Sequence, residues 1–240
     1  MKAVKLVGVD GSIWPLTSVE HAGVFLKAEP VDFAAEPESG KTTGTLELVI
    51  ADNSPTGKPL RPISVSKRQW HNAWSLRKWS KLIVSGGESG QDYFMEVKLS
   101  SPIPDFPELD PEGYVEFSQS VIGRSKSWLR TVSHHAPIAR AANTGDFDVW
   151  PRMRWQQAGI LIMPSGAAIE VPAVDSPRTV WLDPKESCVV KDDAGVIDRD
   201  LWLALRGNIF PEALPADDQY REFHLPDGAD LLSEVEESPW

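Results

Sequence analysis

The sequence of 240 residues contains a single cysteine, Cys188. One thiol cannot form a disulfide within the chain, and it cannot supply the four sulfur ligands of a cysteine-only zinc site. Cys188 lies in the apolar run Ser187-Cys188-Val189-Val190. This setting predicts a small buried side chain rather than a nucleophile.

Long apolar runs are also missing. No stretch approaches the roughly 18 apolar residues that a membrane-spanning helix needs. The first seven residues lack the apolar stretch and the cleavage site of a signal peptide. We therefore expect no membrane partner, and a protein that stays in the cytoplasm in which it is made until something releases it.

The sequence lacks the motifs of common catalytic sites. It has no Gly-x-Ser-x-Gly, and its glycine-rich segment 85–90 lacks the Gly-Lys-Ser/Thr ending of a phosphate-binding loop. Two glycosidase carboxylates brought together from distant strands stay possible, because no local motif marks them. We predict that the protein is not an enzyme, with no catalytic residue and no cofactor.

Metal ligands are not grouped in a recognisable pattern either. His134 and His135 are adjacent, so in a strand their side chains point to opposite faces. The pairs Asp146/Asp148 and Asp192/Asp193 lack the spacing of a calcium loop, and the second pair is more simply part of a hairpin turn. The sequence predicts no metal site.

Negative charge is unevenly distributed along the chain. The net charge is −11; residues 1–140 carry 16 basic and 16 acidic side chains, whereas residues 141–240 carry 8 and 19. Because phosphate binding needs clustered Lys and Arg, the acidic second half argues against nucleic acid as the main partner. We expect a solvated acidic surface there.

The prevailing hydrophobic periodicity is two. Apolar and polar side chains alternate over residues 45–50 and 93–99, as in a half-buried strand. Further strands are predicted over residues 2–8, 81–85, 113–119, 127–133, 147–155, 158–163, 168–172, 178–182, 186–190, 201–206, 220–225 and 229–235. Many short strands separated by turn dipeptides such as Asp10-Gly11 predict a mainly β protein of sandwich or barrel architecture.

One segment breaks this pattern. Trp70 and Trp74 are four residues apart within residues 67–79, which places both on one face of a short helix. Such a helix would pack its tryptophans on a sheet and present Arg68 and Arg77 or Lys78 outward. The window 53–87 contains seven basic residues and no Asp or Glu. Single-stranded nucleic acid is one possible partner, but a basic face in contact with solvent or with an acidic neighbour is the simpler interpretation.

The chain divides into two predicted domains. Residues 136–143 are small, include a proline and mark the change in charge composition. Residues 1–140 would form a barrel- or sandwich-like first domain with a short helix and long loops at 28–44 and 101–112. Residues 141–240 would form a strand-dense domain of a size common for a β-sandwich.

Several short motifs follow one another in a recognisable order. In the first half, residues 11–16 are Gly-Ser-Ile-Trp-Pro-Leu, and the segment 70–79 precedes the strand pair 81–84 and 93–99. In the second half, residues 143–146 are Asn-Thr-Gly-Asp and residues 180–183 are Val-Trp-Leu-Asp. The last motif is Ile-Phe-Pro-Glu-Ala-Leu-Pro at residues 209–215. In this order they resemble the opening hairpin, tryptophan-containing helix and C-terminal galectin-like sandwich of siphophage distal tail proteins, in particular minor tail proteins of actinobacteriophage type. The likeness is best over residues 143–240. The acidic C-terminus and the loop at 28–44 depart from the family.

The resemblance implies a structural protein of the virion tail tip, assembled in the host cytoplasm. In such proteins the first domains close a homo-oligomeric ring, expected to be six-fold, and the galectin-like domains project outward. The implied partners are other copies of the chain, the tail tube protein and the tail-associated baseplate hub protein. The genome would pass through the ring without specific binding.

Ten tryptophans are spread along the chain, and Trp is favoured in cores and interfaces alike. We expect the assembly interface to include tryptophans and cations of the first domain, namely Trp14, Arg68, Trp70, Trp74, Arg77, Lys78 and Trp79. The alternatives are a free-standing β-sandwich carbohydrate-binding module and another tail or baseplate adaptor. A lectin would expose one or more of Trp150, Trp155, Trp181 and Trp202 on an open face, whereas a tail protein would bury them.

Overall fold

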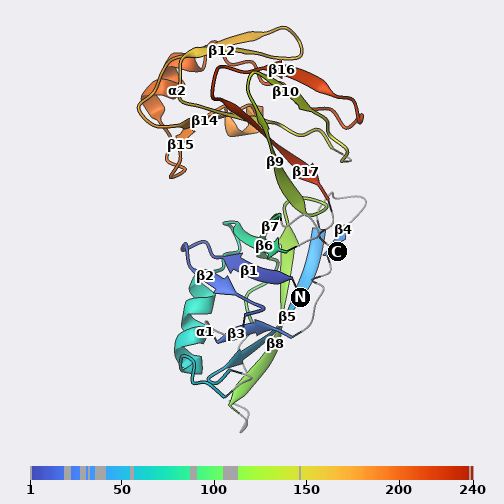
Figure 1. Ribbon diagram of the computed structural model, residues 1–240. Helices are drawn as coiled ribbons and strands as arrows, with labels where there is room; N and C mark the ends of the chain where they lie inside the picture. Colours follow the sequence, from blue (N-terminus) through green and yellow to red (C-terminus); the bar gives the residue numbers. More distant parts are fainter. Residues whose placement is uncertain are drawn as a thin grey trace. The chain divides into compact units, whose positions relative to one another are not determined.

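The computed structural model describes residues 2–18, 23–27, 31, 33–35, 42–54, 57–86, 91–104, 113–145, 147–237 and 239. The chain forms two compact units, Met1–Arg130 with Glu237–Trp240, and Thr131–Glu236. Each has its own cluster of buried apolar side chains. We call them unit 1 and unit 2 and describe each by itself (Figure 1).

Unit 1 combines short antiparallel strands with one helix. Its elements are β1 (Ala3–Val7), β2 (Ile13–Pro15), β3 (Val24–Leu26), β4 (Phe33–Ala35), β5 (Thr42–Ala51), α1 (Ile63–Asn72), β6 (Ser80–Ser85), β7 (Tyr93–Leu99), β8 (Tyr114–Gly123) and the beginning of β9 (Leu129–His135). β5 and β8 pair over ten residues, from Thr42 opposite Gly123 to Ala51 opposite Tyr114.

In unit 1 each strand pairs with the next, and the last pairs with the chain next to the first, so the sheet closes on itself. β2 pairs with β1, β1 with β6, β6 with β7, β7 with β8, β8 with β5, and β5 with β3. The N–H of Leu26 in β3 then donates to the C=O of Leu16, which directly follows β2 (2.9 Å). The strands therefore close into a small barrel, an arrangement that leaves few unpaired strand edges.

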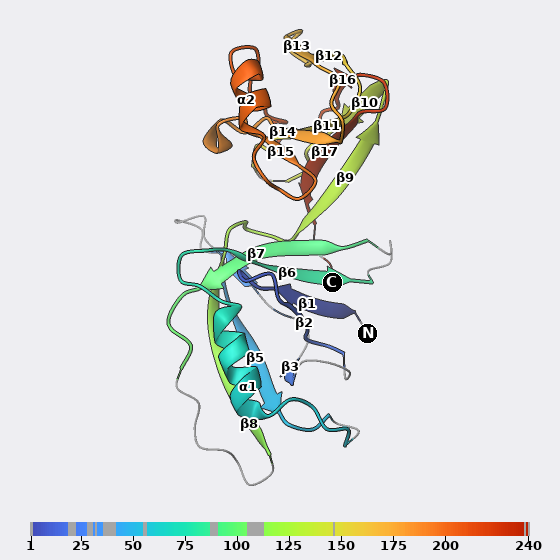
Figure 2. The same ribbon diagram turned by 90° about the vertical axis from the view of Figure 1, so that its left-hand side faces the viewer.

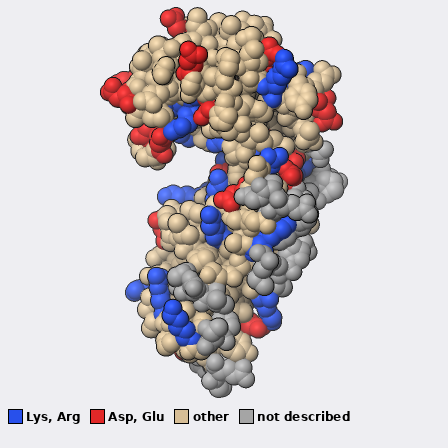
Figure 3. Space-filling model, viewed as in Figure 1, with Lys and Arg blue, Asp and Glu red and all other residues tan. Residues whose placement is uncertain are grey.

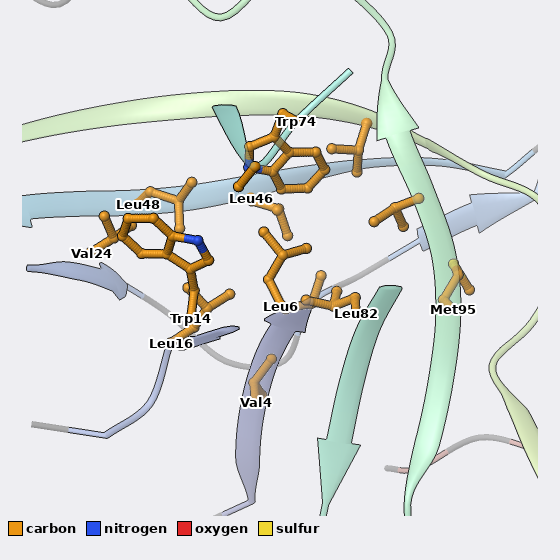
Figure 4. Close-up of a cluster of buried hydrophobic side chains, with 14 of the residues drawn as sticks. Val4, Leu6, Trp14, Leu16, Val24, Leu46, Leu48, Trp74, Leu82 and Met95 are labelled. Atoms are coloured by element: carbon orange, nitrogen blue, oxygen red, sulfur yellow. The ribbon is translucent and has the colours of Figure 1, made fainter. Parts of the chain in front are cut away.

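The helix α1 covers the part of the barrel where β7 and β8 diverge. β8 pairs with β7 through Val121–Gly123, while Gln119, earlier on β8, contacts Trp70 of α1. Figure 2 shows α1 running along β5 and β8. Apolar side chains of β1, β2, β5, β6 and β7 meet Trp74 in the core beneath (Figure 4).

Unit 2 contains two sheets. One has the order β15 (Val190–Asp192), β14 (Arg178–Trp181), β11 (Arg152–Trp155), β17 (Asp230–Glu236) and β9, and the other has the order β10 (Ile138–Ala141), β16 (Arg221–His224), β12 (Gly159–Ile162) and β13 (Ala168–Val171). A short 3₁₀ helix (Pro184–Glu186) and α2 (Arg199–Leu205) flank β15. Buried side chains of both sheets form one cluster, with Met153 and Leu231 from the first and Leu161 and Phe223 from the second. Unit 2 is therefore a β-sandwich.

The predicted mainly β class with a short helix is confirmed. Several segments differ from the prediction. The strand expected over 186–190 is wrong for residues 186–189, because a 3₁₀ helix over Pro184–Glu186 is followed by Ser187 and Cys188 with positive φ, and β15 begins only at Val190. The strand expected over 201–206 is wrong, because Asp198 caps a helical turn there. The helix expected within 67–79 spans Ile63–Asn72, so Trp74 and Trp79 lie in the segment that follows it.

The unit boundary lies at Arg130/Thr131, earlier in the chain than the boundary expected within 136–143. Residues 138–141 of that stretch form the strand β10, because Ala139 and Ala141 are small apolar residues whose side chains fill the core of unit 2. Glu237 belongs to unit 1, where its N–H donates to the C=O of Trp128 (3.0 Å) and its carboxylate accepts from Arg130 (2.7 Å). Among the described residues, no helix is long and apolar enough to cross a membrane.

Candidate assembly surfaces

Three of the tryptophans expected at the assembly interface lie inside unit 1. Trp14, Trp70 and Trp74 are 2%, 0% and 5% exposed. The ring of Trp70 contacts the other two edge to face, at centroid distances of 5.2 Å and 5.6 Å. Trp70 of α1 packs on the strands as expected, Trp74 does so from the segment after the helix, and the three rings give unit 1 an aromatic core.

A buried hydrogen bond fixes this core to the barrel wall. The indole N–H of Trp70 donates to Oε1 of Gln119 (2.9 Å), and Gln119 is 1% exposed. Gln119 is not among the predicted site residues. The signal was present, because Gln119 alternates in phase with Val115, Phe117 and Val121, the buried residues of β8.

The cations of the predicted interface lie on the surface, as expected. Arg68 is exposed on α1, and Arg77 and Lys78 are exposed in the turn that follows it. None of these three forms an ion pair with another described residue. Figure 3 shows Lys and Arg side chains gathered in the region of α1 on the face in view.

The turn 75–78 is held in place by a serine. Ser75 Oγ accepts the N–H groups of Arg77 (3.1 Å) and Lys78 (3.0 Å), and the C=O of Ser75 accepts the N–H of Leu99 in β7 (3.1 Å). Leu76 is 48% exposed between Ser75 and these two cations. We call Leu76, Arg77 and Lys78 the cationic turn.

Trp79 ends this segment and is half-buried. The ammonium of Lys98 lies 4.7 Å from the centre of its ring. This cation–π contact is worth about 0.5–1 kcal/mol at a partly exposed site. It places a third positive charge close to the cationic turn.

Of the four tryptophans that could form a sugar-binding face, one is buried and three are half-buried in unit 2. Trp155 is 1% exposed and donates its indole N–H to the C=O of Pro172 (3.0 Å). Trp150, Trp181 and Trp202 are half-buried. Cations lie over two of these rings: Arg152 and Lys191 over Trp181, at 4.8 Å and 4.3 Å, and Arg206 over Trp202, at 5.9 Å. These four tryptophans form no open platform.

Asn143, from the predicted opening motif of the second domain, is 2% exposed and ties two loops together. Its side-chain N–H₂ donates to the C=O groups of Phe147 (2.6 Å) and Leu214 (2.9 Å). Its Oδ1 accepts the N–H of Gly145 (3.0 Å). A buried amide with its groups paired in this way fixes the backbone around it.

The cysteine, histidines and aspartates considered as catalytic or metal-binding residues lie apart from one another or form structural contacts. Burial, with a smaller contribution from Asp183, raises the pKa of the Cys188 thiol, which makes it less nucleophilic. Asp193 pairs with Arg154, and Asp192 accepts the N–H of Val196 in a hairpin turn. His135 contacts Asp230 (2.6 Å), while burial lowers the pKa of His134.

The described residues contain no group of three or more His, Cys, Asp or Glu side chains arranged around a possible metal position. Asp146 and most of the segment 85–90 lie outside the described residues.

Comparison with known proteins adds information on the fold. No family model and no curated protein matches the chain. Two baseplate structures of phage p2 in its activated conformation, one with calcium and one with strontium, contain a similar chain with a TM-score of 0.50 and 9% identity. The match covers 99% of both chains in the calcium structure and 98% of both in the strontium structure.

A crystal structure of the Dit protein of phage SPP1, from the hub of an adsorption apparatus in phages that infect Gram-positive bacteria, also matches. It has a TM-score of 0.45 and 8% identity, over 97% of this chain and 98% of that chain. At 8–9% identity, such a similarity shows a shared fold and not a shared function. The chain has a fold that occurs in the phage p2 baseplate, and the similarity extends over both units.

Proposed function

We propose that the protein is a structural component of a phage tail tip, a distal tail protein with a galectin-like second unit. Copies of the chain form a ring, with six subunits as the expected number. The ring connects the tail tube to the tail-associated baseplate hub protein. The observation that carries this proposal is the match to the phage p2 baseplate chain over almost the full length of both chains.

The surfaces of the protein are consistent with this role. The order of motifs in the sequence leads independently to the same family. Arg68 and the cationic turn leave several positive charges without partners among the described residues, and unpaired charge on a rigid element is suited to a subunit interface. The alternative of a carbohydrate-binding module has less support, because Trp155 is buried and Trp150, Trp181 and Trp202 are half-buried, so none of the four is openly exposed.

Electron microscopy of the purified full-length chain tests the proposal directly. Negative-stain images over a range of concentrations should show rings with a central hole. A chain that stays monomeric at every concentration, and also when mixed with its tail tube protein, would contradict the ring. A glycan array is the matched test of the alternative, and a clear hit there would favour the lectin.

The contribution of the basic surface has a separate test. Reversing Arg68, Arg77 and Lys78 to Glu should prevent ring formation, because attraction to an acidic neighbour becomes repulsion. The control exchanges cations without changing charge: Arg68→Lys, Arg77→Lys and Lys78→Arg. Rings that form equally well with the reversed residues would exclude this surface from the interface while leaving the tail-tip role intact.

A further inference from the structure

Unit 2 carries an exposed surface that combines aromatic rings with carboxylates. It consists of Phe147, Asp148, Asp217, Asp218 and Tyr220, all of which are exposed. Tyr220 is 76% exposed and Phe147 is 43% exposed. We call these five residues the acidic aromatic surface. Tyrosine is enriched among the residues that contribute most binding energy to protein interfaces, so an exposed Tyr220 beside a second exposed ring suits a binding surface.

This surface is held in a defined shape by Asn143. The side chain of Asn143 binds the backbone on both sides, at Phe147 and Leu214, and its C=O accepts the N–H of Asp218 (3.3 Å). Oδ1 of Asp148 also accepts the N–H of Ala216 (3.4 Å). The two loops are therefore fixed to each other, and little conformational entropy would be lost when a partner binds them.

The surface has an excess of negative charge. Of its three carboxylates, only Asp217 forms an ion pair within the described residues, with Arg221. Tyr220 also has no cation over its ring among the described residues, in contrast to Trp181. Other cations of unit 2, such as Arg154 and Arg178, pair with carboxylates elsewhere. The surface thus matches a partner that brings positive charge and an apolar side chain.

The cationic turn of unit 1 has these properties. It presents Arg77 and Lys78 next to the exposed Leu76, and Ser75 fixes its backbone. Arg77 and Lys78 form no ion pair among the described residues, and they would meet Asp148 and Asp218, which also form none there. Leu76 would cover the aromatic rings, and guanidinium or ammonium groups bind well over such rings.

We propose that the cationic turn of one copy of the chain binds the acidic aromatic surface of a second copy. The inference rests on the self-association in the proposed function and names the surfaces that make one of its contacts. The contact is head to tail, because two different patches meet. Contacts of this kind close into rings when the rotation between subunits allows it.

A charge-exchange experiment tests this contact. One variant carries Arg77→Glu and Lys78→Glu, a second carries Asp148→Lys and Asp218→Lys, and a third carries all four changes. Sedimentation velocity of the full-length chains is measured over a concentration series at low and high salt. Each double reversal should weaken self-association by about tenfold or more, because like charges then face each other. The variant with all four changes should regain most of the lost self-association, because opposite charges face each other again. High salt should weaken the self-association of the wild type.

Two control variants make the same changes in net charge at residues that belong to neither of the two proposed surfaces. Lys185→Glu with Arg199→Glu matches the first variant, and Asp175→Lys with Asp227→Lys matches the second. All four of these side chains are exposed and form no ion pair among the described residues. The controls should associate like the wild type, and circular dichroism should show that every variant is folded.

The outcomes separate the contact from the proposed function. If the wild type assembles and the two double reversals assemble equally well, the contact is wrong and the ring stands. If each reversal weakens assembly but the combination does not recover it, the two surfaces do not meet each other. If the wild type does not self-associate at any concentration or salt, and also stays monomeric when mixed with its tail tube protein, both the contact and the ring are contradicted.

Discussion

At the scale of single residues, polar side chains in the two cores decide how apolar elements are oriented. Trp70 and Gln119 form such a pair in unit 1, with a hydrogen bond between two side chains that are 0% and 1% exposed. Burying a polar group without a partner costs about 1–3 kcal/mol, whereas replacing both partners by apolar groups can be nearly neutral. The pair therefore helps to select one orientation of α1 on the barrel.

A double-mutant cycle measures this pair. Trp70→Phe should lower the free energy of unfolding by about 1–3 kcal/mol, because the amide of Gln119 loses its donor. Gln119→Leu should also destabilise, because the indole N–H is left buried and unpaired. The double variant should be more stable than the sum of the two changes predicts. Urea denaturation followed by circular dichroism gives the four values, and strict additivity would show that the hydrogen bond contributes nothing.

Asn143 has the corresponding role in unit 2. Asn143→Ala removes three hydrogen bonds and leaves the C=O groups of Phe147 and Leu214 with fewer donors. We expect a loss of about 2–3 kcal/mol in the free energy of unfolding. The control is Asn72→Ala, at an exposed position near the end of α1. A similar stability for both alanine variants would mean that water replaces the amide of Asn143.

The candidate site was predicted in part at this scale. Arg68, Arg77 and Lys78 are exposed as expected, because a window with seven cations and no anion cannot be buried at an acceptable energy. The sequence could not show that Trp14 and Trp74 are core residues, since Trp is common in cores and in interfaces. Tyr220 was missed because its exposure depends on loops that meet through Asn143, which lies 77 positions earlier in the chain.

At the scale of elements, the strands were easier to predict than the helices. Alternation predicted β5, β7 and β8 because one face of each is buried and the other is mostly more exposed, with Phe94 of β7 as an exception. The helix α2 was missed because its seven residues are too few for a helical period to stand out. The signal was the cap at Asp198 with Leu201 and Leu205 one turn apart.

The cap of α2 can be tested together with its ion pair. Oδ1 of Asp198 accepts the N–H of Leu201 (3.2 Å), and Oδ2 accepts from Arg178 (2.8 Å). Asp198→Ala removes both and should cost about 2 kcal/mol. Asp198→Asn is the matched control, because Asn also caps helices well but carries no charge, so it should cost less. Equal losses in the two variants would mean that the cap itself contributes little.

The carboxylate of Asp198 also makes the free energy of unfolding depend on pH. The hydrogen bond from Arg178, followed by the N–H of Leu201, lowers the pKa of Asp198 below its ordinary value of 3.8. A carboxyl group with a lowered pKa in the folded state stabilises the protein above its unfolded pKa, and this contribution is lost as the pH falls toward the folded pKa. Wild type should therefore lose more stability than Asp198→Asn between neutral pH and about pH 3. Parallel acid curves would contradict the role of Asp198.

At the scale of the whole molecule, the two cores share no side chain. The cluster of unit 1 is built around Trp70, and that of unit 2 includes Leu231 at its centre. The chain passes from one unit to the other at Arg130/Thr131 and returns at Glu236/Glu237. A boundary that is crossed twice could not be read from composition, because the change in charge lies a few residues after the first crossing and nothing comparable accompanies the second. Two separate cores predict two separate units of unfolding.

Hydrogen exchange with mass spectrometry can follow the two units in one sample. Trp70→Ala should lower protection throughout unit 1, by about 3–5 kcal/mol, and leave unit 2 unchanged. Leu231→Ala, at 0% exposure in the other core, should lower protection in unit 2 by about 2–5 kcal/mol and leave unit 1 unchanged. Each variant is thus the control for the other. Loss of protection in both units from either change would show that the chain unfolds as one body.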